Sequence, residues 1–163
     1  MSRRHDRTYA LLAERMRLRP SLRYALYAVL ALLLASGIAW IGVHYESSIV
    51  PSARHDDLQQ LALEAWTMKV HGAAALVTLV AVGMMLTNHV RRGWALARNR
   101  VSGACVVTTL AVLTLSGYAL YYLVSETTRP PVSVLHWIIG VVAAPLFIAH
   151  IVLGRRARNA TRW

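Results

Sequence analysis

Four long stretches of this chain contain no aspartate, glutamate, lysine or arginine, and they limit the folds that the chain can adopt. They cover residues 24–43, 70–90, 101–125 and 132–154, which is 20, 21, 25 and 23 residues. An α-helix needs about 20 apolar residues to cross the hydrocarbon core of a bilayer. Because lipid cannot satisfy backbone hydrogen-bonding groups, each stretch is expected to be helical. The sequence therefore predicts an all-α integral membrane protein, a bundle of four transmembrane helices.

Positive charge is distributed unevenly between the two ends of these stretches. The chain has a formal net charge of +11 and 18 lysines and arginines, of which only Arg54, Lys69 and Arg129 belong to one of the two sides. The positive-inside rule then places both termini and the 91–100 loop in the cytoplasm. Basic segments beside membrane spans typically meet anionic headgroups. The charge therefore favours membrane lipid as a partner and argues against nucleic-acid binding.

Short connections between the stretches leave no room for a second domain, so we predict one membrane domain over residues 1–163. A cytoplasmic, basic interfacial segment is expected over 1–21, followed by a first span that is too long for a cleaved signal. The largest connection, 46–65, has apolar residues at helical spacing toward Trp66 and predicts a surface helix. The four spans are predicted at about 22–45, 66–90, 101–125 and 132–154.

The chain has one cysteine, Cys105, which lies in the third span. A lone cysteine excludes an intramolecular disulfide, an iron–sulfur cluster and the Cys-x-x-Cys-His attachment of c-type haem.

Four histidines lie inside two of the apolar stretches: His71 and His89 in the second, His136 and His150 in the fourth. Imidazole is polar and is costly to leave unpaired in hydrocarbon. A spacing of 18 residues is about five helical turns and one of 14 falls about 40° short of four turns, so the two histidines of each span share a face. Both spans run inward, which places His71 with His136 in the outer half and His89 with His150 in the inner half. We expect two b-type haems, each held by two histidines, with the outer one better supported.

The two histidine separations differ, which leaves the inner ligand open. They correspond to roughly 27 Å for His71–His89 and roughly 21 Å for His136–His150, a difference that helix tilt can absorb. Met85 lies 14 residues after His71 and repeats the spacing of the fourth span, and a thioether can be an axial haem ligand. We prefer His89 and keep Met85 as the alternative. A third interpretation makes His89 a headgroup-level residue.

Small residues predominate on the faces between the predicted ligands, and Gly140 in the fourth span is one of them. Small side chains let a flat macrocycle approach the backbone. Lys69 and Arg129, at the outer ends of their spans, are candidates for binding the haem propionates. Each is equally well explained as an interfacial anchor.

These residues resemble the small bacterial four-helix di-haem b-type cytochromes, which are related to the membrane cytochrome b subunits of formate dehydrogenase and nickel–iron hydrogenase. The resemblance covers roughly residues 22–156. It implies that His136 and His150 ligate the two haems and that His71 is the outer partner. The dehydrogenase-type subunits take the inner partner from their first span, which has no internal histidine here, and this departure leaves His89 as the inner candidate. The matching segments are His71-Gly72, His89-Val90-Arg91-Arg92-Gly93-Trp94, Gly117-Tyr118, Tyr121-Tyr122 and His136-Trp137-x-x-Gly140 through His150.

The resemblance implies an electron-transfer subunit in the bacterial inner membrane that exchanges electrons with quinone and with an extracytoplasmic redox protein or larger oxidoreductase complex. Two other classes stay open. One is a stand-alone membrane oxidoreductase that acts on a small acceptor at the outer haem. The other is a haem-free protein that uses the histidines for a transition metal or a proton relay.

Overall fold

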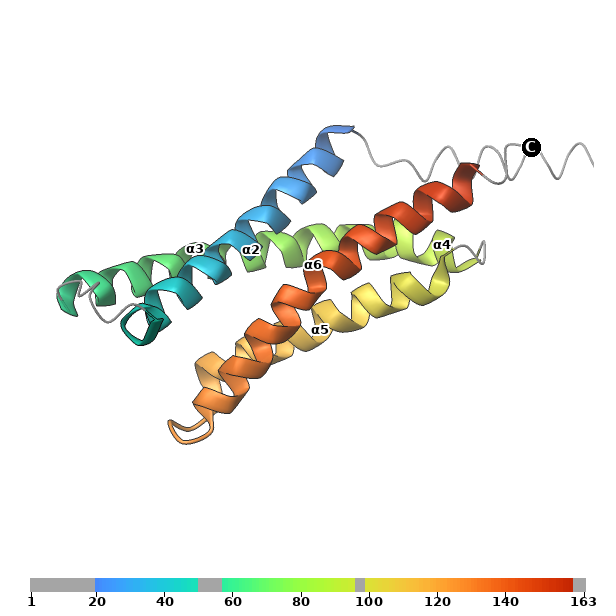
Figure 1. The fold of residues 1–163 in the computed structure, drawn as a ribbon. Helices are drawn as coiled ribbons and strands as arrows, with labels where there is room; N and C mark the ends of the chain where they lie inside the picture. The colour runs from blue at the N-terminus through green and yellow to red at the C-terminus, as the bar shows by residue number, and fades with distance from the viewer. Residues whose placement is uncertain (1–19, 50–56, 96–98, 160–163) are drawn as a thin grey trace, which may run out of the picture.

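The computed structural model describes residues 20–49, 57–95 and 99–159, and these ranges fold into helices without any β-strand (Figure 1). Four of the helices are long and apolar enough to cross a membrane. The chain is therefore an all-α, multi-pass membrane protein, as the charge-free stretches predicted. In chain order the elements are α2 (Pro20–Ile49), α3 (Asp57–Met85), the π-helix η1 (Leu86–Val90), α4 (Arg91–Ala95), α5 (Arg100–Tyr122) and α6 (Arg129–Asn159).

The second membrane helix begins earlier than the sequence suggested. Helix α3 starts at Asp57 and runs without a break into the span, so the helix expected before Trp66 is present as the first turns of α3. The segment between Asp57 and Val70 contains no glycine or proline and is rich in leucine, alanine, glutamine and glutamate, which favour an uninterrupted helix. Of the interfacial segment predicted over 1–21, residues 1–19 lie outside the described residues, and Pro20 and Ser21 belong to α2.

Two prolines begin the last helix and a third lies inside it. Pro130 and Pro131 occupy the first turn of α6, where the missing amide protons have no intrahelical acceptor in any case. Pro145 lies in the interior of α6, where it removes one backbone hydrogen bond. The loop before α6 is closed by Arg129, whose guanidinium donates to the carbonyl of Leu120 at 2.8 Å and to Glu126 Oε1 at 3.2 Å.

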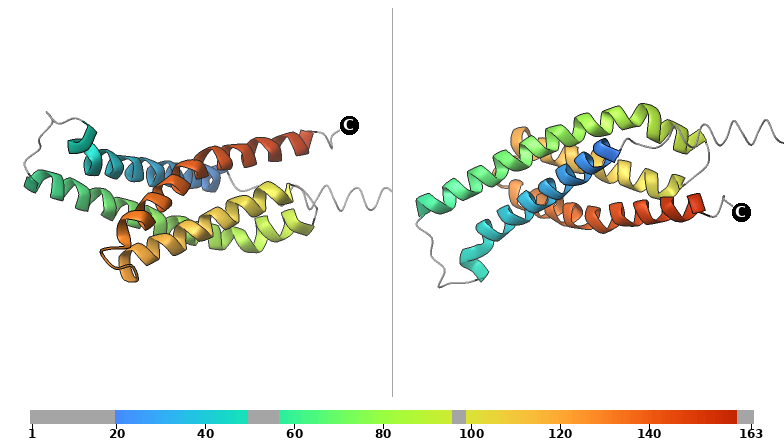
Figure 2. Two further views of the ribbon diagram at one scale, coloured as in Figure 1. Left: turned by 60° about the horizontal axis from the view of Figure 1, so that its bottom comes forward. Right: turned by 90° about the horizontal axis from the view of Figure 1, so that it is seen from above.

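The four long helices form two hairpins. Helices α2 and α3 pack along each other and form the first hairpin, and α5 and α6 form the second. The hairpins meet mainly through α2 and α6, where the rings of Tyr27 and Phe147 lie edge to face with centroids 6.3 Å apart. Figure 2 shows the start of α2, helix α4 and the end of α6 at one end of the bundle.

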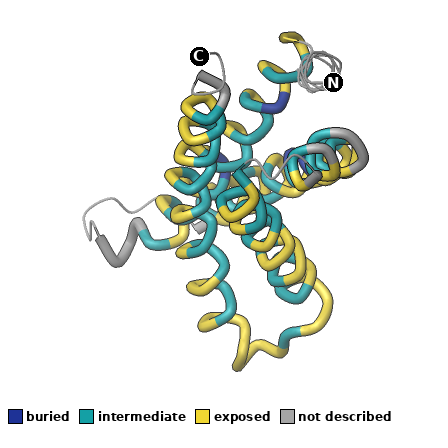
Figure 3. The backbone as a smooth tube through the Cα atoms, turned by 90° about the vertical axis from the view of Figure 1, so that its right-hand side faces the viewer, coloured by how far each residue is buried: buried dark blue, intermediate teal, exposed yellow. Residues whose placement is uncertain are grey.

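Burial is concentrated in the first hairpin. Among the described residues, Leu26, Ser36, Ala74 and Thr78 are buried, and all four belong to α2 or α3 (Figure 3). Large apolar side chains on the outward faces of all four helices are exposed, as a surface in contact with lipid requires. The hairpins are therefore packed within themselves and only lightly against each other.

Candidate functional site

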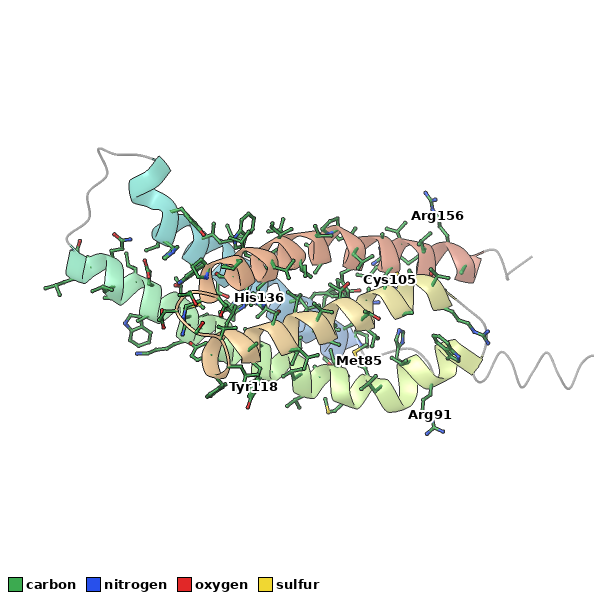
Figure 4. All side chains as sticks on the ribbon, turned by 90° about the horizontal axis from the view of Figure 1, so that it is seen from below. Met85, Arg91, Cys105, Tyr118, His136 and Arg156 are labelled. Carbon is green, nitrogen blue, oxygen red and sulfur yellow. The ribbon has the colours of Figure 1, made fainter. Side chains whose placement is uncertain are left out.

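The four predicted histidines face each other in two pairs across the hairpins. His71 of α3 and His136 of α6 form the first pair, with ring centroids 6.3 Å apart and ring planes at 75°. His89 of η1 and His150 of α6 form the second pair, with centroids 6.5 Å apart and planes at 82°. This is the pairing expected from the spacing, and Figure 4 shows His136 pointing into the bundle.

The separation of the rings has a chemical meaning. Two imidazoles bound through Nε2 on opposite sides of one metal ion have ring centres about 6.2–6.4 Å apart, because each metal–nitrogen bond is about 2.0–2.1 Å and each ring centre lies about 1.1 Å beyond its nitrogen. Rotation of a ring about its metal–nitrogen bond leaves this distance unchanged, so nearly perpendicular planes are compatible with it. At 6.3 Å and 6.5 Å, each pair of rings could therefore hold one metal ion between them.

In the first pair, the α2 backbone fixes which ring nitrogen of His71 carries the proton. His71 Nδ1 lies 3.0 Å from the carbonyl oxygen of Leu33 and 3.1 Å from Ser36 Oγ. A carbonyl oxygen only accepts hydrogen bonds, so Nδ1 must be the protonated nitrogen that donates to it. The lone pair is then on Nε2, the nitrogen that is available for a metal.

The partner ring, His136, is held by α5 in a similar way. His136 Nδ1 lies 2.8 Å from Ser116 Oγ, and that hydroxyl donates its proton to the carbonyl of Leu113 at 3.2 Å. Because a serine hydroxyl has one proton, a Ser116 hydroxyl that donates to Leu113 accepts from His136. Nδ1 again carries the proton and Nε2 the lone pair.

In the second pair, His150 is held by two residues at the start of α5. Ser102 Oγ lies 2.9 Å from His150 Nδ1 and donates to Asn99 Oδ1 at 2.6 Å. The amide of Asn99 donates to the His150 carbonyl at 3.1 Å and lies 3.3 Å from Nδ1. We assign the Nδ1 proton to the shorter contact, the one with Ser102. Asn99 has φ 54° and is the only described non-glycine residue with positive φ, a conformation that asparagine tolerates better than most residues.

A glycine follows each of these serines and leaves room for the ring edge. A Cβ atom would lie 3.3 Å from His71 Cε1 if built at Gly37, 3.4 Å from His136 Cε1 at Gly117, and 3.6 Å from His150 Cε1 at Gly103. The rings of these three histidines therefore lie against glycines, where the backbone carries no side chain.

His89, the fourth histidine, lies on the π-helix that ends the second span. The described segment is regular α-helix to Met85 and π-helical from Leu86 to Val90, with a wider turn than an α-helix. The ring that faces His150 is that of His89, three residues beyond the start of this segment. Met85, the alternative from the sequence, is the last residue of regular α3.

The other predicted site residues make local contacts. A Cβ atom at Gly140 would meet only Leu113 Cδ2, at an ordinary 3.9 Å. The ammonium of Lys69 lies over the Trp66 ring, 4.7 Å from its centroid, and Arg129 closes the α5–α6 loop. Figure 4 shows Arg91 and Arg156 pointing away from the bundle.

Sequence reasoning missed the role of Ser36, Ser102 and Ser116. Serine in a membrane helix commonly bonds to its own helix, so these residues gave no reason to expect contacts with histidine. A signal was present: Ser-Gly occurs three times in the chain, and Ser102 and Ser116 are 14 residues apart, as His136 and His150 are.

No known protein family, curated protein or solved structure shows a significant match to this chain.

Proposed function

We propose that this protein is a membrane b-type cytochrome that carries electrons between quinone or quinol and a partner redox protein through two bis-histidine haems. His71 and His136 would hold one haem, and His89 and His150 the other. The observation that carries the proposal is the distance between the paired rings, 6.3 Å and 6.5 Å, which suits two imidazoles on opposite sides of one iron.

The composition of each pair favours a porphyrin over a bare metal ion. Protein zinc and non-haem metal sites usually have three or four protein ligands. Among the described residues, no cluster of three or more histidine, cysteine, aspartate or glutamate side chains could hold a metal ion. Two axial imidazoles are enough when a porphyrin supplies the four equatorial nitrogens.

The chain's own residues supply ligation, orientation and insulation. Bound haem would supply reversible one-electron chemistry, and its potential would respond to the axial ligands and to burial. His136 and His150 are 14 residues apart on α6, so the two sites are separated by about 21 Å along the membrane helix. The apolar side chains of the four helices exclude water and ions from the path between them.

The distribution of charge orients this path. With the arginine-rich ends in the cytoplasm, the first pair lies toward the outer face and the second toward the inner face. In this proposal, a partner redox protein exchanges electrons with the haem near one membrane face, and membrane quinone exchanges electrons with the other haem. The corresponding location is the bacterial inner membrane.

The proposal is tested by the reduced-minus-oxidised spectrum of the full chain, purified in detergent from cells supplied with haem. We expect a b-type spectrum and two haems per chain by the pyridine haemochrome assay. His44→Ala is the matched control: His44 lies in α2, stacks on Trp40 and bonds to Glu64, and its loss should leave both haems in place. A chain that purifies folded without haem contradicts the proposal.

A further inference from the structure

The three Ser-Gly dipeptides all contact site histidines. Ser36, Ser102 and Ser116 belong to the helix adjacent to a histidine, and each hydroxyl lies 2.8–3.1 Å from an imidazole Nδ1. Each is followed by a glycine whose Cβ position lies 3.3–3.6 Å from Cε1 of the same ring. These are all the Ser-Gly dipeptides in the chain. Packing alone does not explain why this one dipeptide recurs at three rings.

We infer that each Ser-Gly dipeptide is a histidine-positioning module, in which the serine oxygen accepts the Nδ1 proton and the glycine admits the edge of the ring. At His71 the serine shares that proton with the carbonyl of Leu33, which is the nearer acceptor. The module keeps the lone pair on Nε2, the nitrogen that is then available to bind a metal. As far as it concerns haem, the inference rests on the proposed function; as far as it concerns the tautomer, it stands without haem.

Within each module the serine hydroxyl makes two hydrogen bonds: it accepts one from the histidine and donates the other to a second acceptor. Ser116 Oγ donates to Leu113 O at 3.2 Å, Ser36 Oγ donates to Leu33 O at 3.0 Å, and Ser102 Oγ donates to Asn99 Oδ1 at 2.6 Å. A hydroxyl that has given its single proton to such an acceptor can only accept from the histidine. Donation from Nδ1–H raises the basicity of an imidazole ligand. A more basic ligand favours ferric iron, so the modules would lower the reduction potential.

The same helix offers a matched control. Thr114 lies two residues before Ser116 and is exposed, and its hydroxyl donates to Leu110 O at 2.8 Å within its own helix. Removing the Thr114 hydroxyl therefore takes away a helix-internal hydrogen bond of the same kind without touching a histidine. Both Thr114→Ala and Ser116→Ala remove a hydroxyl that bonds within its own helix, but only Ser116→Ala removes a contact with a histidine.

The experiment compares these two variants in the full chain with histidine labelled by nitrogen-15. In the haem-free protein, nitrogen chemical shifts report the tautomer of each ring. We expect Nδ1–H at His136 in the parent chain and in Thr114→Ala, and a substantial Nε2–H population in Ser116→Ala. An unchanged His136 tautomer in Ser116→Ala overturns the inference, whether or not the chain binds haem.

In the haem-loaded protein the same pair is compared by redox titration and by haem transfer to an excess of a haem-scavenging protein. Loss of such outer contacts typically costs about 10–100-fold in metal affinity. We expect Ser116→Ala to raise the potential of one haem and to speed its loss about 10-fold or more, whereas Thr114→Ala does neither. Equal behaviour of the two variants overturns the inference while leaving the cytochrome proposal intact. A parent chain that binds no haem refutes the cytochrome proposal and leaves the tautomer result to decide the modules.

Discussion

The first and second histidine pairs reach nearly the same ring separation by different local structures. Both use α6, but His71 faces it from regular α-helix and His89 from the π-helix η1. In an unbroken α-helix His89 would lie about 27 Å beyond His71, whereas the α6 ligands are about 21 Å apart. A π-helical turn is wider, so it advances less per residue and also rotates the side chains that follow. The comparison teaches that one pair is built from regular helix alone, whereas the other places one of its rings on an irregular turn.

Anchoring also differs between the α6 histidines. The ring of His136 is held by Ser116 and that of His150 by Ser102. His150 has a further hydrogen bond, from the Asn99 amide to its backbone carbonyl, and Asn99 caps α5 in the left-handed conformation. The left-handed conformation costs most residues about 1–2 kcal/mol, and asparagine less than most. Such strain tends to be retained at functional sites, and here it belongs to the second pair.

The largest effects are expected from the α6 ligands themselves. In the proposed cytochrome, His136→Ala and His150→Ala each remove one haem and leave roughly half of the pigment, because each iron loses an axial ligand. The pyridine haemochrome assay measures the loss, and the remaining haem has a different midpoint potential in the two variants. If either variant keeps both haems, the replaced histidine is not a ligand.

The next prediction concerns the π-helix. His89→Ala should remove the second haem, whereas Met85→Ala should keep both, because the ring that faces His150 is that of His89. Haem content and the spectra of the two variants, purified side by side, distinguish the two residues. A loss confined to Met85→Ala would assign the ligand to the thioether and give the second haem a histidine–methionine spectrum.

Asn99 allows a smaller and more selective test of the second pair. Glycine adopts φ 54° without steric cost, so Asn99→Gly removes the side-chain bonds and relieves the backbone, whereas Asn99→Ala removes the bonds and increases the backbone strain. We expect both variants to lose the second haem several-fold faster, with the alanine variant also less stable by about 1 kcal/mol. Haem transfer and thermal unfolding measure the two effects, and faster loss of the first haem instead would contradict the assignment.

The smallest effects are expected at the glycines beside the rings. Alanine at Gly37 should disturb haem binding more than alanine at Gly117, and Gly103→Ala least, since their Cβ atoms would lie 3.3, 3.4 and 3.6 Å from the ring carbons. Gly72→Ala is the control, because nothing lies within 4 Å of its Cβ position. Haem content after purification ranks the series. A larger loss at Gly72 than at Gly37 would show that helix flexibility and not ring clearance matters here.

Much of the fold was predictable because a membrane-spanning helix must be long enough and apolar enough to cross the bilayer. Four charge-free stretches gave four membrane helices, since length and apolarity alone decide whether a segment can span. The start of α3 at Asp57 was missed because a change in polarity does not end a helix when the backbone has no reason to stop.

The helices that carry the paired histidines could be predicted from the sequence. The residues that hydrogen-bond to those histidines could not. Periodicity placed His71 with His136 and His89 with His150, since spacing on a helix determines the face. The serine partners depend on how α2 and α5 rotate against their neighbours, which the sequence of a single helix does not specify. The π-helix at Leu86–Val90 was equally hidden, because no glycine or proline marks it.

The division into two hairpins has a consequence for biogenesis. Each histidine pair takes one ring from the α3–η1 segment and the other from α6, and the direct packing between hairpins is slight. In the proposed holoprotein each haem would therefore connect the two hairpins. Its binding free energy would contribute to the free energy of assembling them. In a newly inserted polypeptide the two hairpins would remain loosely associated until both haems are bound. The supply of haem in the cell would then limit the abundance of the mature protein.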